Sequence, residues 1–148
     1  MTFLSNGNKA AGAKQFEVAV QEYQKAVDKY SDNHLAWYGM GAAQAQRGEW
    51  DKASEGFARA VQIADNQPMY QMWYGISLYE KAVKQARDDQ ARKENKKPEE
   101  IKPDLSVVNF DKAHQHLSEA VKLNADMWRA HYYLGRIYRE QDKPKDAA

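Results

Sequence analysis

Four histidines and 21 acidic residues are the groups with which this cysteine-free chain of 148 residues could carry out chemistry. His114 and His116 are two residues apart, so on a helix they point in different directions and do not share a metal ion. The acids between residues 88 and 100 alternate with Lys and Arg, a pattern typical of a solvated face. The sequence has no phosphate-binding Gly-rich loop, no Gly-x-Ser-x-Gly turn and no His-Glu-x-x-His motif. We therefore predict no enzymatic activity, no cofactor and no metal site.

Charge and composition narrow the remaining classes of protein to which this chain could belong. The 22 Lys and Arg residues against 21 Asp and Glu leave a net charge of +1, which does not support nucleic-acid binding. The hydrophobic fraction of 43% is enough for one folded domain. No apolar run approaches the roughly 20 residues of a spanning helix, so we expect no direct membrane insertion. Because residues 1–14 lack a secretory pattern, we expect a cytoplasmic location, or a periplasmic or envelope-associated one if a signal was removed.

The elements that position these residues follow from an internal repeat. Gly7, Gly41 and Gly75 are each 34 residues apart, and Ala19 and Ala53 lie twelve residues after the first two glycines. Large residues recur at matching places around the alanines. Small residues that face large ones allow two antiparallel helices to approach closely. The period therefore predicts stacked helix pairs that share one core.

The unit AWYGMGAAQAQRGEWDKASEGFARAVQIA, residues 36–64, resembles the tetratricopeptide repeat (TPR) family, and the resemblance covers nearly the whole chain. It implies an all-α TPR solenoid of antiparallel helix pairs wound as a right-handed superhelix. The repeats are predicted at residues 1–33, 34–67, 68–127 and 128–148. The fourth ends inside its second helix, where Pro144 replaces an aromatic residue, so we expect the chain to be part of a longer protein.

Repeat three contains an insertion of 26 residues, at about 82–107. Arg87 stands where an alanine is expected, and Phe110, Ala113 and Leu117 supply the missing pattern later. Strong helix formers predict that the first helix continues to about residue 95, before prolines force a turn. We predict an extended helical hairpin, with a returning helix that starts near Pro103. The insertion is either a second contact surface, a lid, or a tolerated elaboration.

In the TPR family the first helices of the repeats line a concave groove, and the resemblance assigns its residues here. Repeats two and three provide mainly apolar positions, and repeat four provides a cationic end. The predicted groove residues are Leu35, Tyr38, Ala42, Met69, Met72, Trp73, Ile76, Tyr79, Arg129, Tyr132, Arg136 and Arg139. The alternative is that the Met and Tyr residues are covered by the inserted hairpin or by C-terminal repeats missing from this chain, and that the arginines are solvated and paired with acids.

The predicted function is a protein–protein interaction scaffold or adaptor domain that binds a peptide or helix with apolar anchors and an acidic residue. TPR domains that grip heat-shock chaperone tails use Lys and Asn at defined positions, and here only Asn8 fits, so we predict that this domain is not such a clamp. The alternatives are self-assembly, in which repeat ends stack into a homo-oligomer, and a regulatory domain attached to an enzyme.

Overall fold

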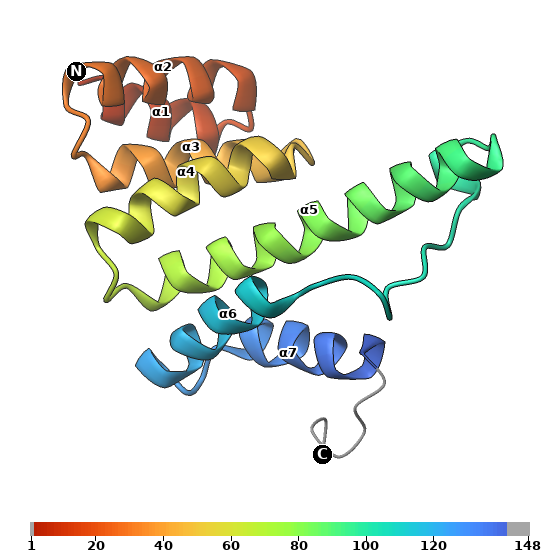
Figure 1. The fold of residues 1–148 in the computed structure, drawn as a ribbon. Helices are drawn as coiled ribbons and strands as arrows, with labels where there is room; N and C mark the ends of the chain where they lie inside the picture. The colour runs from red at the N-terminus through yellow and green to blue at the C-terminus, as the bar shows by residue number, and fades with distance from the viewer. Residues whose placement is uncertain (1, 142–148) are drawn as a thin grey trace.

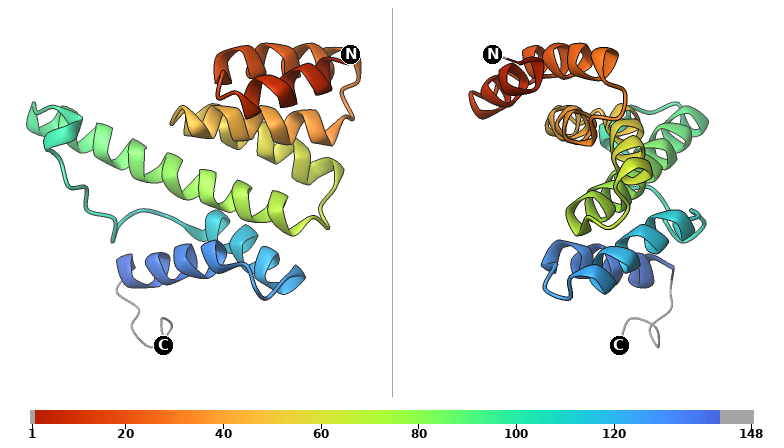
Figure 2. Two further views of the ribbon diagram at one scale, coloured as in Figure 1. Left: turned by 180° about the vertical axis from the view of Figure 1, so that it is seen from behind. Right: turned by 90° about the vertical axis from the view of Figure 1, so that its left-hand side faces the viewer.

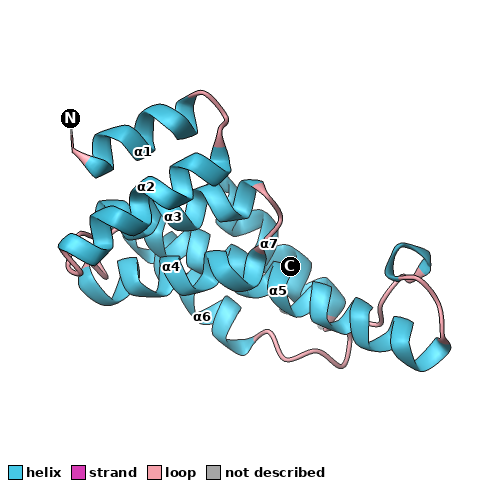
Figure 3. Cartoon of the chain, turned by 90° about the horizontal axis from the view of Figure 1, so that it is seen from above, coloured by secondary structure: helices cyan, strands magenta, loops and turns pink. Residues whose placement is uncertain are grey.

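The computed structural model describes residues 2–141, and within this range the regular structure is entirely helical (Figures 1 and 3). The elements are α1 (Phe3–Gly12), α2 (Phe16–Lys29), α3 (His34–Gln46), α4 (Trp50–Ile63), α5 (Pro68–Glu94), the short 3₁₀ helix η1 (Pro98–Glu100), α6 (Asp111–Leu123) and α7 (Trp128–Glu140). No helix in this range is both long enough and apolar enough to cross a membrane.

Short polar turns set the helix lengths. Thr2 and Asn33 cap α1 and α3, because their side-chain oxygens accept hydrogen bonds from the backbone N–H groups of Ser5 and Ala36. The turn after α3 places Gly48 at a φ of 72°, which only glycine adopts without strain. The Gly48 turn reverses the chain after α3, so α3 and α4 are antiparallel (Figure 1).

The helices stack in chain order, from α1 at one end to α7 at the other (Figure 2). Each of α2, α4 and α6 packs against the helix before it and the helix after it. The core therefore forms three clusters along the stack, centred on repeats one, two and three. Trp37 joins the first cluster to the second, and Trp50 and Trp73 join the second to the third. This continuity lets a short chain form an extended body.

Glycines allow the closest helix contacts, as the small-and-large pattern predicts. The Tyr23 ring of α2 is wedged between α1 and α3: a Cβ on Gly7 would lie 2.6 Å from it, and one on Gly39 would lie 2.5 Å from it. In the third pair, a Cβ on Gly75 would lie 2.7 Å from Leu117 Cγ. A Cβ at any of these positions would force the facing side chain or its helix to shift.

The insertion differs from the predicted helical hairpin in its returning half. α5 does extend to Glu94, close to the predicted end, and projects beyond the stack (Figure 1). The chain then returns through η1 and a non-helical segment, and α6 begins only at Asp111. Asp104 Oδ1 accepts hydrogen bonds from the backbone N–H and the hydroxyl of Ser106, which favours a turn at the place where the helix was predicted to start. The predicted returning helix is therefore wrong.

The returning segment is nevertheless attached to the body. Ala91 on α5 and Ile101 are both buried. The Gln141 side-chain amide donates to the carbonyls of Leu105 and Val108, at 3.3 and 3.0 Å. The predicted second helix of repeat four, which includes Pro144, lies outside the described residues.

The glycine contact between α5 and α6 gives a first prediction. Gly75→Ala adds a Cβ 3.1 Å from the Ala113 carbonyl oxygen as well as against Leu117. Overpacking costs about 1–3 kcal/mol, which exceeds the ~1 kcal/mol that alanine gains in helix propensity. We expect a lower free energy of unfolding in urea. Gly12→Ala is the control, because a Cβ there meets open space. Equal or greater stability of Gly75→Ala would contradict the assigned role of this contact.

Candidate functional site

A groove of about 390 Å³ runs between α1 and α3. Its residues include Leu4 and Asn8 of α1 and Leu35, Tyr38, Ala42 and Gln46 of α3. Three of the predicted groove residues, Leu35, Tyr38 and Ala42, are therefore brought together here. Leu35 is the most accessible of the three, with 53% of its surface exposed. The lining is apolar with a few amide side chains, and none of the lining residues is Asp, Glu, Lys or Arg.

The walls of this groove are held by aromatic side chains. The Tyr23 hydroxyl donates to Asn8 Oδ1 at 2.7 Å, which fixes one amide of the groove. The Tyr38 ring stacks on Tyr70 of α5, with ring centroids 4.7 Å apart. Burial raises the pKa of both Tyr23 and Tyr38 above the ordinary tyrosine value. The groove is therefore neutral and largely preformed.

The apolar groove predicted in repeat three does not exist as a surface. Met72, Ile76 and Tyr79 are only 1–3% exposed, and they share one core cluster with Ala130 and Ile137 of α7. Their prediction as groove residues is wrong, because α6 and α7 cover this face of α5. Ala82 and Leu105 of the insertion also pack against the same cluster, and Phe110, which follows the insertion, stacks on Tyr79. Of the same set, Met69 stays exposed and Trp73 is half-buried, stacked on Phe57.

The predicted cationic residues lie together on α7. Arg129, Tyr132, Arg136 and Arg139 follow a spacing of three or four residues, which places them on one helix face. The Arg136 guanidinium lies 3.5 Å from a Glu140 carboxylate oxygen, so this arginine is paired, as the alternative interpretation proposed. No ion pair involves Arg129 or Arg139 within residues 2–141.

Two reciprocal hydrogen bonds tie α5 to α7 beneath this face. The Tyr79 hydroxyl donates to Glu140 at 3.0 Å, and the Tyr133 hydroxyl donates to Glu80 at 2.9 Å. Burial and the neighbouring carboxylates hold the pKa of both tyrosines well above its usual value near 10. These bonds satisfy polar groups that α7 would otherwise bury without partners.

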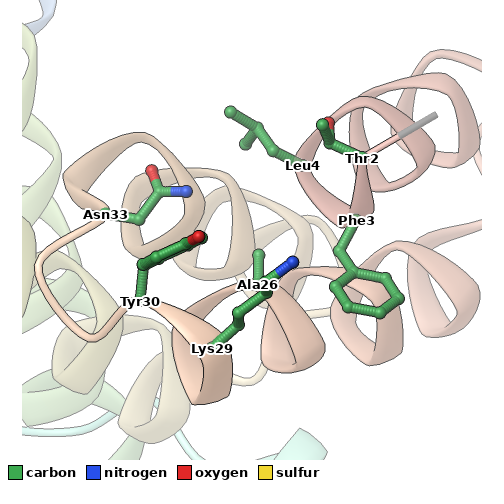
Figure 4. Close-up of a pocket in the computed structure, with 7 residues that line it drawn as sticks. All are labelled: Thr2, Phe3, Leu4, Ala26, Lys29, Tyr30 and Asn33. Atoms are coloured by element: carbon green, nitrogen blue, oxygen red, sulfur yellow. The ribbon is translucent and has the colours of Figure 1, made fainter.

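A second cavity, of about 380 Å³, lies at the N-terminal end of the stack, and the sequence analysis did not foresee it (Figure 4). It is lined by Phe3 and Leu4 of α1, by Ala26 and Lys29 of α2, and by Tyr30 and Asn33 from the connection to α3. Tyr30 is 60% exposed and follows the last residue of α2. In the sequence, the feature that could have indicated this cavity is Tyr30, an aromatic residue at the end of a helix.

The histidines have structural partners. The ring nitrogens of His114 and His116 lie 2.7 and 2.8 Å from Tyr138 Oη and Gln71 Oε1, in agreement with the prediction that they point apart. Among the described residues, no three His, Cys, Asp or Glu side chains are grouped so that they could hold a metal ion.

Comparison with known proteins identifies the class. Family models described as tetratricopeptide repeat match residues 10–73 and 108–148. Anaphase-promoting complex subunit 3 of Schizosaccharomyces pombe (strain 972 / ATCC 24843) is 27% identical over a match 150 residues long, gaps included, and this match covers 95% of this chain. The match covers only 22% of that relative, so the chain spans about a fifth of its length.

Solved structures agree on the fold. A crystal structure of MamA protein superposes with a TM-score of 0.76 at 18% identity, over 98% of this chain and 65% of that one. The first TPR of Spaghetti (RPAP3), bound to the HSP90 peptide SRMEEVD, superposes with a TM-score of 0.70 at 14% identity, over 95% and 90%. Stacked antiparallel helix pairs beside a groove define a helical-repeat protein. The chain belongs to the tetratricopeptide repeat family.

The tyrosine bonds between α5 and α7 predict an alkaline weakening of the fold. In the unfolded chain tyrosines ionise near pH 10, whereas Tyr79 and Tyr133 have a raised pKa in the folded state. Their stabilising contribution is complete below pH 10 and is lost as the pH rises above it. The free energy of unfolding, measured in urea between pH 9 and 11, should fall less steeply in Tyr79→Phe than in the parent chain. Tyr30→Phe, which removes an exposed hydroxyl, should keep the parent slope. Identical slopes in all three proteins would refute this role.

Proposed function

We propose that this chain is a non-enzymatic scaffold or adaptor domain of a longer protein, and that it binds a segment of a partner protein in the groove between α1 and α3. The observation that carries the proposal is the groove itself, which is open, apolar and held by buried tyrosines. A preformed groove binds with a smaller entropic cost than a flexible one.

The chemistry of the lining defines the segment that suits it. Leu4, Leu35 and Ala42 offer apolar contact, and Asn8 and Gln46 offer amides at the same surface. An extended or helical segment with spaced apolar anchors fits such a surface, because its side chains find the apolar walls while its polar groups find the amides. Charge at the centre of the segment would be desolvated without a charged partner.

The relatives support a role in assemblies. One structural relative holds a peptide, and the curated relative is, by its name, a subunit of a complex. The short span of the match supports the view that such a domain works within a longer protein.

The groove lining also predicts a peptide that should not bind there. It contains no Lys or Arg, and the Asn8 oxygen already accepts the Tyr23 hydroxyl. The peptide SRMEEVD, which one structural relative binds, should therefore bind in the groove more weakly than about 1 mM, a free energy of about −4 kcal/mol. Isothermal titration calorimetry of the parent chain and of Asn8→Ala measures this, because binding in the groove would be sensitive to that change. A micromolar affinity that Asn8→Ala abolishes would restore the clamp interpretation.

The test of the groove is a selection of random twelve-residue peptides displayed on phage, followed by affinity measurement of the recovered peptides. We expect Leu35→Glu to weaken the binding of these peptides at least tenfold, because their apolar anchors would bury the new carboxylate. A tenfold loss of affinity corresponds to ~1.4 kcal/mol. Ile63→Glu is the matched control, because it changes an exposed apolar residue of α4 outside the groove.

Two outcomes would overturn the proposal. If no peptide is enriched, or if the recovered peptides bind Leu35→Glu as tightly as the parent, the groove is not the binding site. If sedimentation equilibrium then shows reversible association that Leu35→Glu leaves unchanged, the self-assembly alternative takes its place.

A further inference from the structure

Another cavity, of about 320 Å³, is polar and lies where the turn between α4 and α5 meets α6; the turn and the C-terminal end of α6 are on the same side of the stack (Figure 1). Its polar lining consists of two carboxylates, one imidazole and three side-chain amides: Asp65, Glu119, His116, Asn66, Gln71 and Gln115. Within the described part of the chain, no Lys or Arg lines this cavity. Its chemistry therefore differs from that of the groove between α1 and α3.

A chain of hydrogen bonds fixes the role of His116 in this cavity. The side-chain nitrogen of Gln71, a residue only 4% exposed, donates to the Asp65 carbonyl oxygen at 2.8 Å. The side-chain oxygen of Gln71 is therefore the atom that lies 2.8 Å from His116 Nδ1. Because an amide oxygen can only accept, Nδ1 carries the hydrogen. In a neutral ring Nε2 then keeps its lone pair and is a hydrogen-bond acceptor.

The surroundings of His116 favour the neutral ring. Burial and, after it, the Lys112 ammonium lower the pKa of His116, whereas the Glu119 carboxylate opposes them. From α5 the Tyr74 ring packs on the imidazole, with ring centroids 4.5 Å apart, and Lys112 lies over that same ring. From the turn, the Asp65 carboxylate lines the cavity. At neutral pH the cavity thus contains an imidazole acceptor beside two carboxylates.

These acceptors suit a guanidinium. Among residues 2–141, no ion pair involves Asp65 or Glu119. The two carboxylates come from different elements, the turn and α6, so a ligand that meets both needs donors on more than one side. A guanidinium has five N–H donors that diverge in one plane, and it stays charged at every physiological pH.

The rest of the lining suits the remainder of an arginine residue. Leu123, 39% exposed, also lines the cavity and offers apolar surface to the aliphatic stem. The exposed amides of Asn66 and Gln115 can pair with backbone groups on either side of the arginine. The volume is at the lower end of the ~300–1,000 Å³ of small-molecule sites, so one long side chain fits it better than a larger ligand.

We propose that this cavity binds an arginine side chain of a partner protein, whose guanidinium donates to Asp65, Glu119 and His116 Nε2. No residue of the cavity lines the groove between α1 and α3, so this site goes beyond the proposed function and is tested separately from it.

The test is a nuclear magnetic resonance titration of the ¹⁵N-labelled full chain at pH 7.5 and low salt. The probes are the peptide acetyl-GSRSG-amide and the same peptide with citrulline, a neutral analogue of nearly the same shape, in place of arginine. We expect the arginine peptide to shift the side-chain NH₂ signals of Gln71 and to bind at least fivefold more tightly than the citrulline peptide. Asp65→Asn and Glu119→Gln should each weaken it about threefold or more.

Two control variants separate this site from other effects. Glu17→Gln removes an exposed acid of α2 outside the cavity and should leave the affinity unchanged. Leu35→Glu should also leave it unchanged, so a failure of the groove proposal does not affect this result. Equal binding of the two peptides, no shift of the Gln71 signals, or insensitivity to both acid variants would overturn the proposal.

The pH dependence of binding tests the role of His116 Nε2. Protonation turns this nitrogen into a donor and adds a positive charge, so the affinity for the arginine peptide should fall between pH 7.5 and pH 5.5. His116→Gln does not titrate at this position, so its affinity should fall less over the same range. An equal fall in both proteins would contradict the assigned role of Nε2 and overturn the proposal in this form.

Discussion

The close approach of helices at glycine positions is the constraint on which the rest of this structure depends. At Gly7, Gly39 and Gly75 the neighbouring Tyr23 or Leu117 side chain fills the space that a Cβ would occupy. A close-packed interior has no room for both, so each glycine sets the separation and register of its helix pair. Tyr23 contacts two first helices at once, and its hydroxyl then holds Asn8 at the edge of the groove. The packing and the binding surface thus share a residue.

The crossing of α5 and α7 also depends on close packing, here between larger side chains. Burial of Met72, Ile76 and Tyr79 under α6 and α7 removes an apolar face from solvent, which stabilises the stack. The same crossing brings the Tyr79 and Tyr133 hydroxyls to Glu140 and Glu80, so that buried polar atoms are paired. The exposed surface at this end is the face of α7 that carries Arg129, Tyr132 and Arg139, which is cationic and aromatic.

The molecule therefore presents two surfaces of different chemistry. The groove between α1 and α3 is neutral and apolar, whereas the face of α7 is positively charged. A stack in which each repeat contacts only its neighbours can carry such separate surfaces, because a change in one repeat has little effect on a distant one. The projecting end of α5 and its returning segment extend the body further, with local hydrogen bonds rather than a second helix holding their shape.

The sequence by itself determined the helix pairs, because the spacing of Gly7, Gly41 and Gly75 and their large partners is a local property of each helix surface. It also predicted the length of α5 and brought Leu35, Tyr38 and Ala42 to one helix face. It did not determine which faces remain exposed. Tertiary structure alone decided that α6 and α7 cover Met72 and Ile76, and that Phe3 and Tyr30 line one cavity. The physical reason is that periodicity defines the faces of one helix, whereas burial depends on which other helix crosses that face.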